Sequence, residues 1–227
     1  SRSSSPPPRT FAAARAAAAC MTTSAPTVGW IGLGNIGLPM ARRVLAAGLP
    51  LQVWARRRET AAPIVDAGAS FAENPEALAR ACDVIATIVG GPDDVSELHR
   101  RMAPRARPCA VFVDMTTASP GNARESGALA ALAGAFAIDA PVTGGVAGAT
   151  QGALTSFVGG DADALARARP VLEAFCRRIV PCGAAGSGYR MKLVNQTIVA
   201  GVLLGLADGA ALARAGGMSA PAVKDAL

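Results

Sequence analysis

The chain has 227 residues, of which 51% are apolar and only 4% aromatic, a length that suits one large domain or one domain with part of a second. Its formal charge of +6 is uneven, because three of its 22 basic residues lie before Val28 with no acid among them, and no basic tract is interleaved with aromatics; this argues against a nucleic-acid site. A single histidine and five scattered cysteines without a CxxC pair argue against a zinc site or a histidine-assisted nucleophile, and such cysteines are typical of a reducing compartment.

Residues 1–27 differ in composition from the rest of the chain. They are rich in Ser and Pro and then in Ala and Arg, and they lack apolar periodicity, so we expect no packed element there. Two interpretations stay open. The composition matches a transit peptide, which would direct the protein to a mitochondrion or plastid. Alternatively, Met21 is the true start of a cytoplasmic protein and the preceding residues are translated upstream sequence, which is the interpretation we prefer.

From Val28 onward, short apolar runs alternate with longer stretches of helical spacing. This alternation predicts βαβ units and therefore a doubly wound α/β fold with a parallel sheet. A last short strand is expected at Ile179–Val180, followed by a flexible glycine-rich hinge at Gly183–Gly188. The other expected strands are Val28–Ile31, Leu51–Trp54, Val84–Val89, Ala110–Asp114, Phe136–Asp139 and Ser156–Val158. The expected helices are Leu38–Ala47, Glu59–Ala67, Pro75–Arg80, Asp94–Met102, Ala123–Leu132 and Ala164–Cys176.

A glycine motif, Gly32-Leu-Gly34-Asn-Ile-Gly37, follows the first expected strand and opens the first expected helix. Gly32 permits a tight turn, Gly34 lets the backbone approach a pyrophosphate, and Gly37 lets the helix pack closely on the strand. Phosphates then lie at the helix N-terminus, where free N–H groups favour anions. Because strand, spacing and helix occur together, they predict a dinucleotide site rather than an ordinary glycine-rich turn.

The end of the second expected strand predicts which dinucleotide binds. An NAD enzyme usually places an acid there for the ribose 2′-hydroxyl, but this chain has Ala55 followed by Arg56 and Arg57. Arginines suit a 2′-phosphate through charge-assisted, bidentate contacts, so we expect NADP rather than NAD. The alternative is a solvated arginine run on a surface loop.

Two further segments follow expected strands and offer polar groups. Thr143 with the amides of Gly144 and Gly145 would form a small nest of donors for a carboxylate. The segment 114–117 (Asp-Met-Thr-Thr) offers two hydroxyls at another strand end, where open α/β sheets bind ligands. Plain turn chemistry is the alternative for both segments.

Lys192 and Lys224 are the only lysines in a chain with twenty arginines. The pKa of a lysine can be lowered by its surroundings, so that it gives up a proton, whereas arginine stays protonated. A general acid needs this property, while a surface cation does not. After Lys192, the segment Gln196–Gly217 is the one candidate for a membrane span. This segment contains Asp208 and Arg214, so its uninterrupted apolar stretch is expected to be too short to cross a bilayer. We expect the segment to form a long, mostly buried helix instead.

Together these segments resemble the β-hydroxyacid dehydrogenase family, which includes 3-hydroxyisobutyrate dehydrogenase, tartronate semialdehyde reductase and the glyoxylate/succinic semialdehyde reductases. The resemblance runs from about Val28 to the end of the chain. Four motifs in order carry it: GLGNIGLPMA (32–41), DMTT (114–117), DAPVTGG with GALTSFVGGD (139–145, 152–161) and GSGYRMKLVNQ (186–196). It implies a leader or non-native extension (1–27), a Rossmann-like NAD(P)-binding domain (28–190) and the first helices of a truncated all-α domain (191–227).

The resemblance also implies roles for individual residues. Lys192 would be the catalytic lysine and act as the general acid. The residues that would bind the carboxylate-bearing substrate are Thr117, Thr143, Gly144, Gly145, Asn195 and Gln196. The residues that would bind the cofactor are Gly32, Leu33, Gly34, Asn35, Ile36, Gly37, Arg56, Arg57, Ile88, Val89 and Thr117.

The sequence departs from the family pattern in several places. Thr143 stands where many members have serine, Gln196 where many have asparagine, and Val89-Gly90 where members usually have Leu-Pro. The chain also ends at Leu227, before most of the family's helical domain. We therefore expect a fragment that binds NADPH, scarcely turns over, and exposes an apolar patch through which it associates.

The implied reaction is NADPH-dependent reduction of a small carboxylate-bearing aldehyde or keto acid to the hydroxy acid. The full-length state is expected to be a homo-oligomer, with neither nucleic acid nor a membrane as a partner. Two alternatives stay open, a catalytically inactive NADP-binding fragment and a related imine reductase-type enzyme. Imine reductases usually lack this lysine, and 6-phosphogluconate dehydrogenase has Lys-x-x-His-Asn where this chain reads Lys192-Leu-Val-Asn-Gln196.

Overall fold

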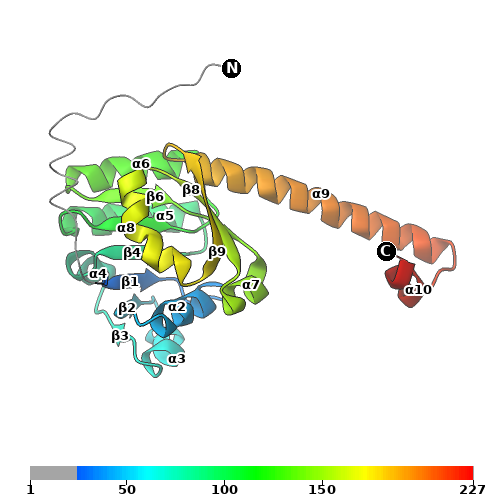
Figure 1. Cartoon of the computed structure of the whole chain (residues 1–227), viewed down its shortest axis with the longest axis horizontal. Helices are drawn as coiled ribbons and strands as arrows, with labels where there is room; N and C mark the ends of the chain where they lie inside the picture. Colours follow the sequence, from blue (N-terminus) through cyan, green and yellow to red (C-terminus); the bar gives the residue numbers. More distant parts are fainter. Residues whose placement is uncertain (1–24, 227) are drawn as a thin grey trace, which may run out of the picture.

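The computed structural model describes residues 25–226, so the interpretations of residues 1–27 fall almost wholly outside the described part. It contains a nine-stranded sheet with helices on both faces, and a long helix that extends away from this body (Figure 1). The strands are β1 (Val28–Ile31), β2 (Leu51–Trp54), β3 (Ser70–Phe71), β4 (Val84–Thr87), β5 (Val111–Asp114), β6 (Phe136–Asp139), β7 (Val142–Thr143), β8 (Leu154–Gly159) and β9 (Cys176–Gly183). The helices are α2 (Gly37–Ala46), α3 (Ala62–Val65), α4 (Pro75–Ala81), α5 (Pro92–Met102), α6 (Pro120–Leu132), α7 (Gly145–Gln151), α8 (Ala162–Glu173), α9 (Ser187–Ala215) and α10 (Ala220–Ala226), with 3₁₀ turns η1 (Arg58–Ala61) and η2 (Ala103–Arg105).

The strand order is β3-β2-β1-β4-β5-β6-β8-β7, with β9 beside β8. All pairs from β3 to β6 are parallel, as the alternation of strands and helices predicts. The sheet departs from the predicted parallel arrangement at its other edge, where β8 runs antiparallel to β6 and β7. Only residues 144–153, which include the short helix α7, join β7 to β8, and a parallel crossover needs about a dozen residues or more. The antiparallel return of β8 along β7 then also places it antiparallel to the end of β6.

Buried apolar side chains form a separate core on each face of the sheet. Along β4, Val84 and Ala86 face one core and Ile85 faces the other, as the two-residue period of a strand requires. The first core packs α2 and α8 against the sheet, and the second packs α4, α5 and α6. Strands buried on both faces explain the continuous apolar runs of the sequence and confirm the doubly wound fold.

Most element boundaries differ from the predicted ones by a few residues, and two expected helices change more. The expected helix at Glu59–Ala67 is split into η1 and α3, which restarts with Pro63 in its first turn, a position that tolerates the missing N–H. The expected helix at Ala164–Cys176 instead begins after the N-cap Asp161 and ends at Glu173, and Cys176 opens β9. The short elements β3, β7 and α7 were not predicted.

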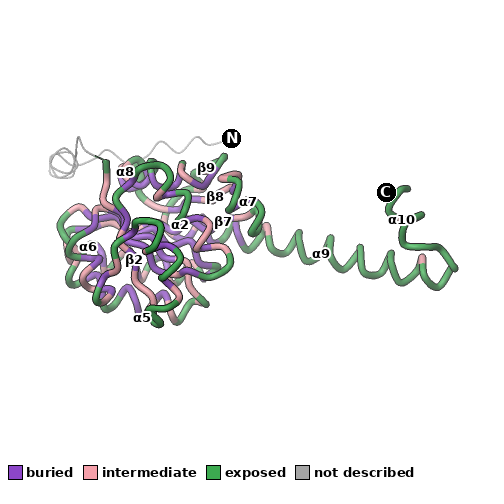
Figure 2. The backbone as a smooth tube through the Cα atoms, turned by 90° about the horizontal axis from the view of Figure 1, so that it is seen from below, coloured by how far each residue is buried: buried purple, intermediate pink, exposed green. Residues whose placement is uncertain are grey.

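Helix α9 differs most from expectation, because it is not a buried helix in the described part of the chain. Of its 29 residues, only Gly188, Tyr189 and Lys192 are buried, and the rest of the helix is largely exposed along its length (Figure 2). The exposed apolar side chains on α9 are Met191, Leu193, Val194, Ile198, Val199, Val202, Leu203, Leu204, Leu206 and Leu212. The expected exposed apolar patch is therefore confirmed, and association through it stays a prediction.

The expectation that this segment is too short to cross a bilayer is also wrong by length and composition. Helix α9 contains an 18-residue window with a mean hydropathy of 1.6, which is the one candidate membrane span found among residues 25–226. Length and hydropathy do not distinguish a membrane span from a helix that packs on another apolar surface.

Candidate active site

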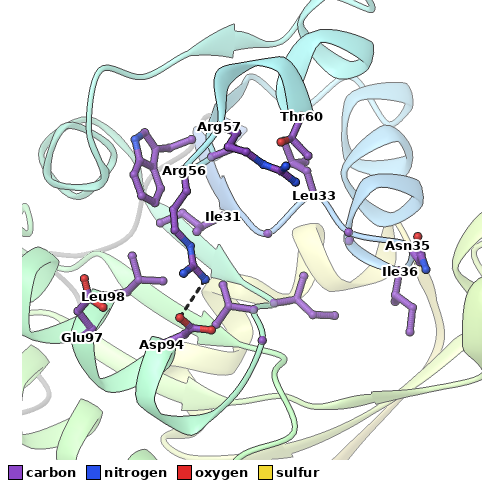
Figure 3. Close-up of a pocket in the computed structure, with 18 of the residues that line it drawn as sticks. Ile31, Leu33, Asn35, Ile36, Arg56, Arg57, Thr60, Asp94, Glu97 and Leu98 are labelled. Atoms are coloured by element: carbon purple, nitrogen blue, oxygen red, sulfur yellow. Dashed lines mark hydrogen bonds and ion pairs between the residues drawn. The ribbon is translucent and has the colours of Figure 1, made fainter.

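A cavity of about 860 Å³ lies at the carboxyl ends of β1 and β4, where the strand order reverses. Open α/β sheets bind ligands in such a crevice. The cavity is lined by every residue predicted to bind the cofactor except Thr117 (Figure 3). Of the remaining lining residues, only Ala55 and Gly90 stood out in the sequence, and neither as a ligand. The others are Ile31, Trp54, Thr60, Asp94, Glu97, Leu98 and Arg101.

The glycine motif forms the floor of this cavity, with a different geometry at each glycine. Gly32 has a φ of +103°, and a Cβ there would lie 1.9 Å from the carbonyl oxygen of Ile88. A Cβ on Gly37 would lie 2.1 Å from the carbonyl oxygen of Gly32, so helix and strand pack as closely as the motif predicts. Gly34 has no atom within 4 Å on its Cβ side, which leaves its backbone open to an approaching group.

The N-terminus of α2 opens at the same place. The N-cap residue Ile36 provides no side-chain hydrogen bond. In the first turn Leu38 N donates to Gly34 O at 3.0 Å and Pro39 has no N–H, so the N–H of Gly37 is the donor left without a cap. Free donors at a helix N-terminus bind phosphate well, because the helix dipole also favours an anion there. The residues present therefore fit a dinucleotide pyrophosphate.

The opposite wall of the cavity carries charged side chains from two elements. Arg56 follows β2, and its Nη2 lies 2.9 Å from Oδ1 of Asp94, in the first turn of α5 (Figure 3). Arg56 is thus already ion-paired, which the sequence did not predict. Its side chain is 74% exposed, so this pair contributes little stability and a competing anion could displace it. Helix α5 directly follows β4, one of the two strands between which the strand order reverses and where ligands bind. This position in the sequence could have identified Asp94.

The predicted substrate-binding residues lie along the same edge of the sheet but do not line the cavity. Thr117 is exposed in the loop after β5, where a ligand could reach its hydroxyl. The neighbouring Thr116 is buried, and its Oγ1 accepts a hydrogen bond from Val89 N at 3.0 Å, so only one of the two hydroxyls is available. Thr143 ends β7, and Gly144 and Gly145 lead into α7 with φ of +131° and +65°.

Lys192 lies near the start of α9 and is 8% exposed. Within the part of the chain that the structure describes, its Nζ has no hydrogen bond and no ion pair. Burial without a counter-charge lowers the pKa of Lys192 from its usual value. One turn further on, Oδ1 of Asn195 is also buried without a partner in the described residues, whereas Gln196 is exposed. The helix thus holds a lysine of the kind that proton transfer requires.

Comparison with known proteins assigns this arrangement to a family. The family model for the NAD binding domain of 6-phosphogluconate dehydrogenase matches residues 27–183. A probable 3-hydroxyisobutyrate dehydrogenase of Mycobacterium tuberculosis is 38% identical over 207 residues, which cover 88% of this chain and 68% of the relative. The chain belongs to the β-hydroxyacid dehydrogenase family.

Other members of the β-hydroxyacid dehydrogenase family agree with this assignment. A solved structure of M. tuberculosis 3-hydroxyisobutyrate dehydrogenase with L-serine has 36% identity and a TM-score of 0.81, over 89% of this chain and 70% of that one. A relative from Pseudomonas aeruginosa, 34% identical over 88% of this chain and 68% of its own length, is named NAD-dependent L-serine dehydrogenase. The chain is accordingly an oxidoreductase of the hydroxyacid dehydrogenase type.

The comparisons support an NAD(P) cofactor and do not distinguish NAD from NADP. One relative's name specifies NAD, whereas a solved structure with 31% identity and a TM-score of 0.80, over 88% of this chain and 72% of that one, contains NADP⁺. Solved imine reductases with 22% identity share the fold, with TM-scores of 0.79 and 0.80. At that identity they show the fold alone.

Proposed function

We propose that this protein reduces a small aldehyde or keto acid that bears a carboxylate to the corresponding hydroxy acid, with NADPH as the reductant and Lys192 as the general acid. The observation that carries the proposal is Lys192 itself, a buried lysine without a partner in the described residues. It lies at the strand edge that also carries the dinucleotide cavity, in a family whose named members are dehydrogenases.

The proposed chemistry divides between the cofactor and the protein. The nicotinamide, when bound, supplies or accepts the hydride. Lys192 Nζ would donate a proton to the carbonyl oxygen during reduction and would take it back during oxidation, and its lowered pKa makes the ammonium a better proton donor. The Thr117 and Thr143 hydroxyls and the Gly144 and Gly145 N–H groups would hold the carboxylate away from the reacting carbon.

The direct test is oxidation of 3-hydroxy acids followed at the absorbance of the reduced cofactor. We expect NADP⁺ to be reduced with a short 3-hydroxy acid such as 3-hydroxyisobutyrate or L-serine, and not with the matched alcohol that lacks the carboxylate. The carboxylate anchor is the reason for this difference. Binding of NADPH without any turnover would instead identify a catalytically inactive nucleotide-binding protein.

We expect NADPH to bind more tightly than NADH, because Ala55 offers no acceptor for a ribose 2′-hydroxyl and two arginines lie at that end of the cavity. Replacing Arg57 by Glu should weaken NADPH binding by about 10- to 100-fold, as expected for the loss of a charged hydrogen bond worth roughly 1.5–3 kcal/mol, and should affect NADH much less. Trp54 lines the cavity and provides the fluorescence signal for both titrations.

Arg58 provides the matched control for this test. It follows Arg57 directly, but its guanidinium lies 4.6 Å from the ring centroid of Phe71 and it does not line the cavity. Arg58→Glu should therefore leave the ratio of NADPH to NADH affinity nearly unchanged. Equal or tighter binding of NADH to the wild-type protein would contradict the proposed preference. The homo-oligomeric state and the cellular location stay predictions.

A further inference from the structure

Helix α9 carries Lys192, yet it contacts the α/β body only near its start. Gly188, Tyr189 and Lys192 are its buried residues, and Lys192 is the last of them. The rest of the helix extends into solvent in the described structure (Figures 1 and 2). The position of the lysine therefore depends on the contacts of one helical turn.

The backbone of this turn is held by Asp139 at the end of β6. Its Oδ1 accepts a hydrogen bond from Gly186 N at 2.7 Å, and its Oδ2 accepts one from Tyr189 N at 2.8 Å. The carboxyl group is 2% exposed; burial raises its pKa, and the backbone donors oppose that rise. These two bonds fix where α9 begins. Backbone N–H groups lie close to the helix axis, so bonds to them restrain rotation of the helix about that axis less than a side-chain bond does.

A side-chain contact adds a rotational restraint to the close packing of Gly188 on the strands. Tyr189 Oη donates a hydrogen bond of 2.6 Å to Oδ2 of Asp114 at the end of β5. Asp114 is itself fixed, because its Oδ1 accepts from Thr116 N at 2.9 Å. Tyr189 is 1% exposed and Asp114 is 2% exposed, so the bond is shielded from water. Burial and the neighbouring carboxylate raise the pKa of Tyr189, which keeps the hydroxyl protonated as a donor.

We propose that Tyr189 is a positioning residue for Lys192, acting through its hydrogen bond to Asp114. Residues three apart lie on the same face of a helix, so the bond that fixes the direction of Tyr189 also fixes the direction and burial of Lys192. This inference rests on the proposed function only in giving Lys192 a catalytic role. The competing explanation is that Tyr189 merely fills space against Ala118 and Ala123, in which case a phenylalanine would serve equally well.

The test uses the fact that the chain has two lysines. In protein labelled with ¹³C-lysine, the Cε signals of Lys192 and Lys224 can be followed separately against pH, without any turnover. Tyr189→Phe keeps the ring and removes the hydroxyl. We expect the titration midpoint of Lys192 to move upward in this variant, because a helical turn that is less restrained about its axis exposes the ammonium more and relieves part of the desolvation that lowers its pKa. The signal of the exposed Lys224 should not move.

Other ionisable groups near this turn must be accounted for in that titration. Asp139 on β6 contacts the turn directly, and Cys182 on β9 lies near Asp139. Asp114 on β5 interacts with His99 on α5, and Arg190 on α9 is exposed. Tyr189→Phe substitutes none of them, and among them only Asp114 loses a hydrogen-bond donor. A change in their protonation that was independent of Tyr189 would therefore appear equally in the wild-type protein.

Thr197→Val is the matched control, since it also deletes a hydroxyl hydrogen bond within α9, from Thr197 Oγ1 to Leu193 O at 3.0 Å. It should leave Lys192 unchanged. Asp114→Asn provides a second variant in case Tyr189→Phe folds poorly, and its amide can still pair with the tyrosine hydroxyl, so it should shift Lys192 less. The shift of Lys192 in the double variant should be smaller than the sum of the shifts in the two single variants, because both changes affect the hydrogen bond between Tyr189 and Asp114.

An unchanged Lys192 midpoint in folded Tyr189→Phe, or an equal shift in Thr197→Val, would overturn the proposal. Neither result would bear on whether Lys192 transfers a proton. Conversely, a Lys192 variant that retained full turnover would refute the proposed function and leave the positioning of this side chain by Tyr189 intact.

Discussion

Lys192→Arg is expected to retain cofactor binding and to lose about 10²–10⁴-fold in turnover, the usual contribution of general acid–base catalysis. The substitution keeps a positive charge at the site but removes the ability to give up a proton, because guanidinium does not deprotonate in proteins. The dinucleotide cavity does not include Lys192, so the affinity for NADPH should be within a few-fold of wild type. Steady-state rates and a fluorescence titration on the same preparation measure both quantities.

Lys224→Arg is the matched control, because Lys224 is the other lysine of the chain and is exposed on α10. It should leave turnover unchanged. The relatives are longer than this chain, so both substitutions should also be compared in a fusion that continues the chain with the part of the mycobacterial relative that it does not cover. If Lys192→Arg turned over within a few-fold of wild type, Lys192 would be an electrostatic anchor and not the proton donor.

Gly188→Ala should lower the free energy of unfolding by about 1–3 kcal/mol or more, the range for inserting a methyl group into a well-packed site. A Cβ at Gly188 would lie 2.4 Å from the carbonyl oxygen of Phe157 and 2.6 Å from that of Asp139. Because both obstacles are backbone atoms of strands, the helix must move away from the sheet. Urea unfolding measures the loss, and the turnover of this variant should fall with it, since Lys192 lies one turn further along.

Gly201→Ala, in the same helix, should have the opposite effect. No atom lies within 4 Å of a Cβ at Gly201, so the substitution meets no obstacle. Alanine is favoured over glycine in a helix by about 0.8–1 kcal/mol, and the free energy of unfolding should rise by up to that amount. Similar unfolding curves for the two variants would show that the start of α9 is not packed as the structure indicates.

Local patterns allowed much of the fold to be predicted from the sequence. The short apolar runs identified β1, β2, β4, β5, β6, β8 and β9, with boundary errors of a few residues at most, and the helical spacing between them identified most of the helices. The glycine motif could be recognised from the sequence because Gly32, Gly34 and Gly37 act through their own backbone, in the turn that they form together. The predicted cofactor residues therefore line one cavity, apart from Thr117.

The features that could not be predicted depend on residues far apart in the chain. Arg56 and Asp94 are separated by 38 residues, and Asp114 and Tyr189 by 75, so neither pairing leaves a local pattern. The exposure of α9 was missed for a related reason. An apolar helix must be covered by something, but its sequence does not say which surface covers it. Among the described residues only the short helix α10 contacts the distal part of α9, and most of its apolar side chains stay exposed.

The single-ended attachment of α9 makes it a lever whose fulcrum lies beside Lys192. A 29-residue helix is roughly 43 Å long, so a tilt of about 10° would carry its tip by roughly 7 Å while moving Lys192 by about 1 Å. A displacement of that size at a reacting group can reduce a rate by about 10²-fold. A surface that holds the distal end of α9 would therefore limit the movement of Lys192. Contacts tens of ångströms from the reacting carbon would then determine how precisely this lysine is positioned.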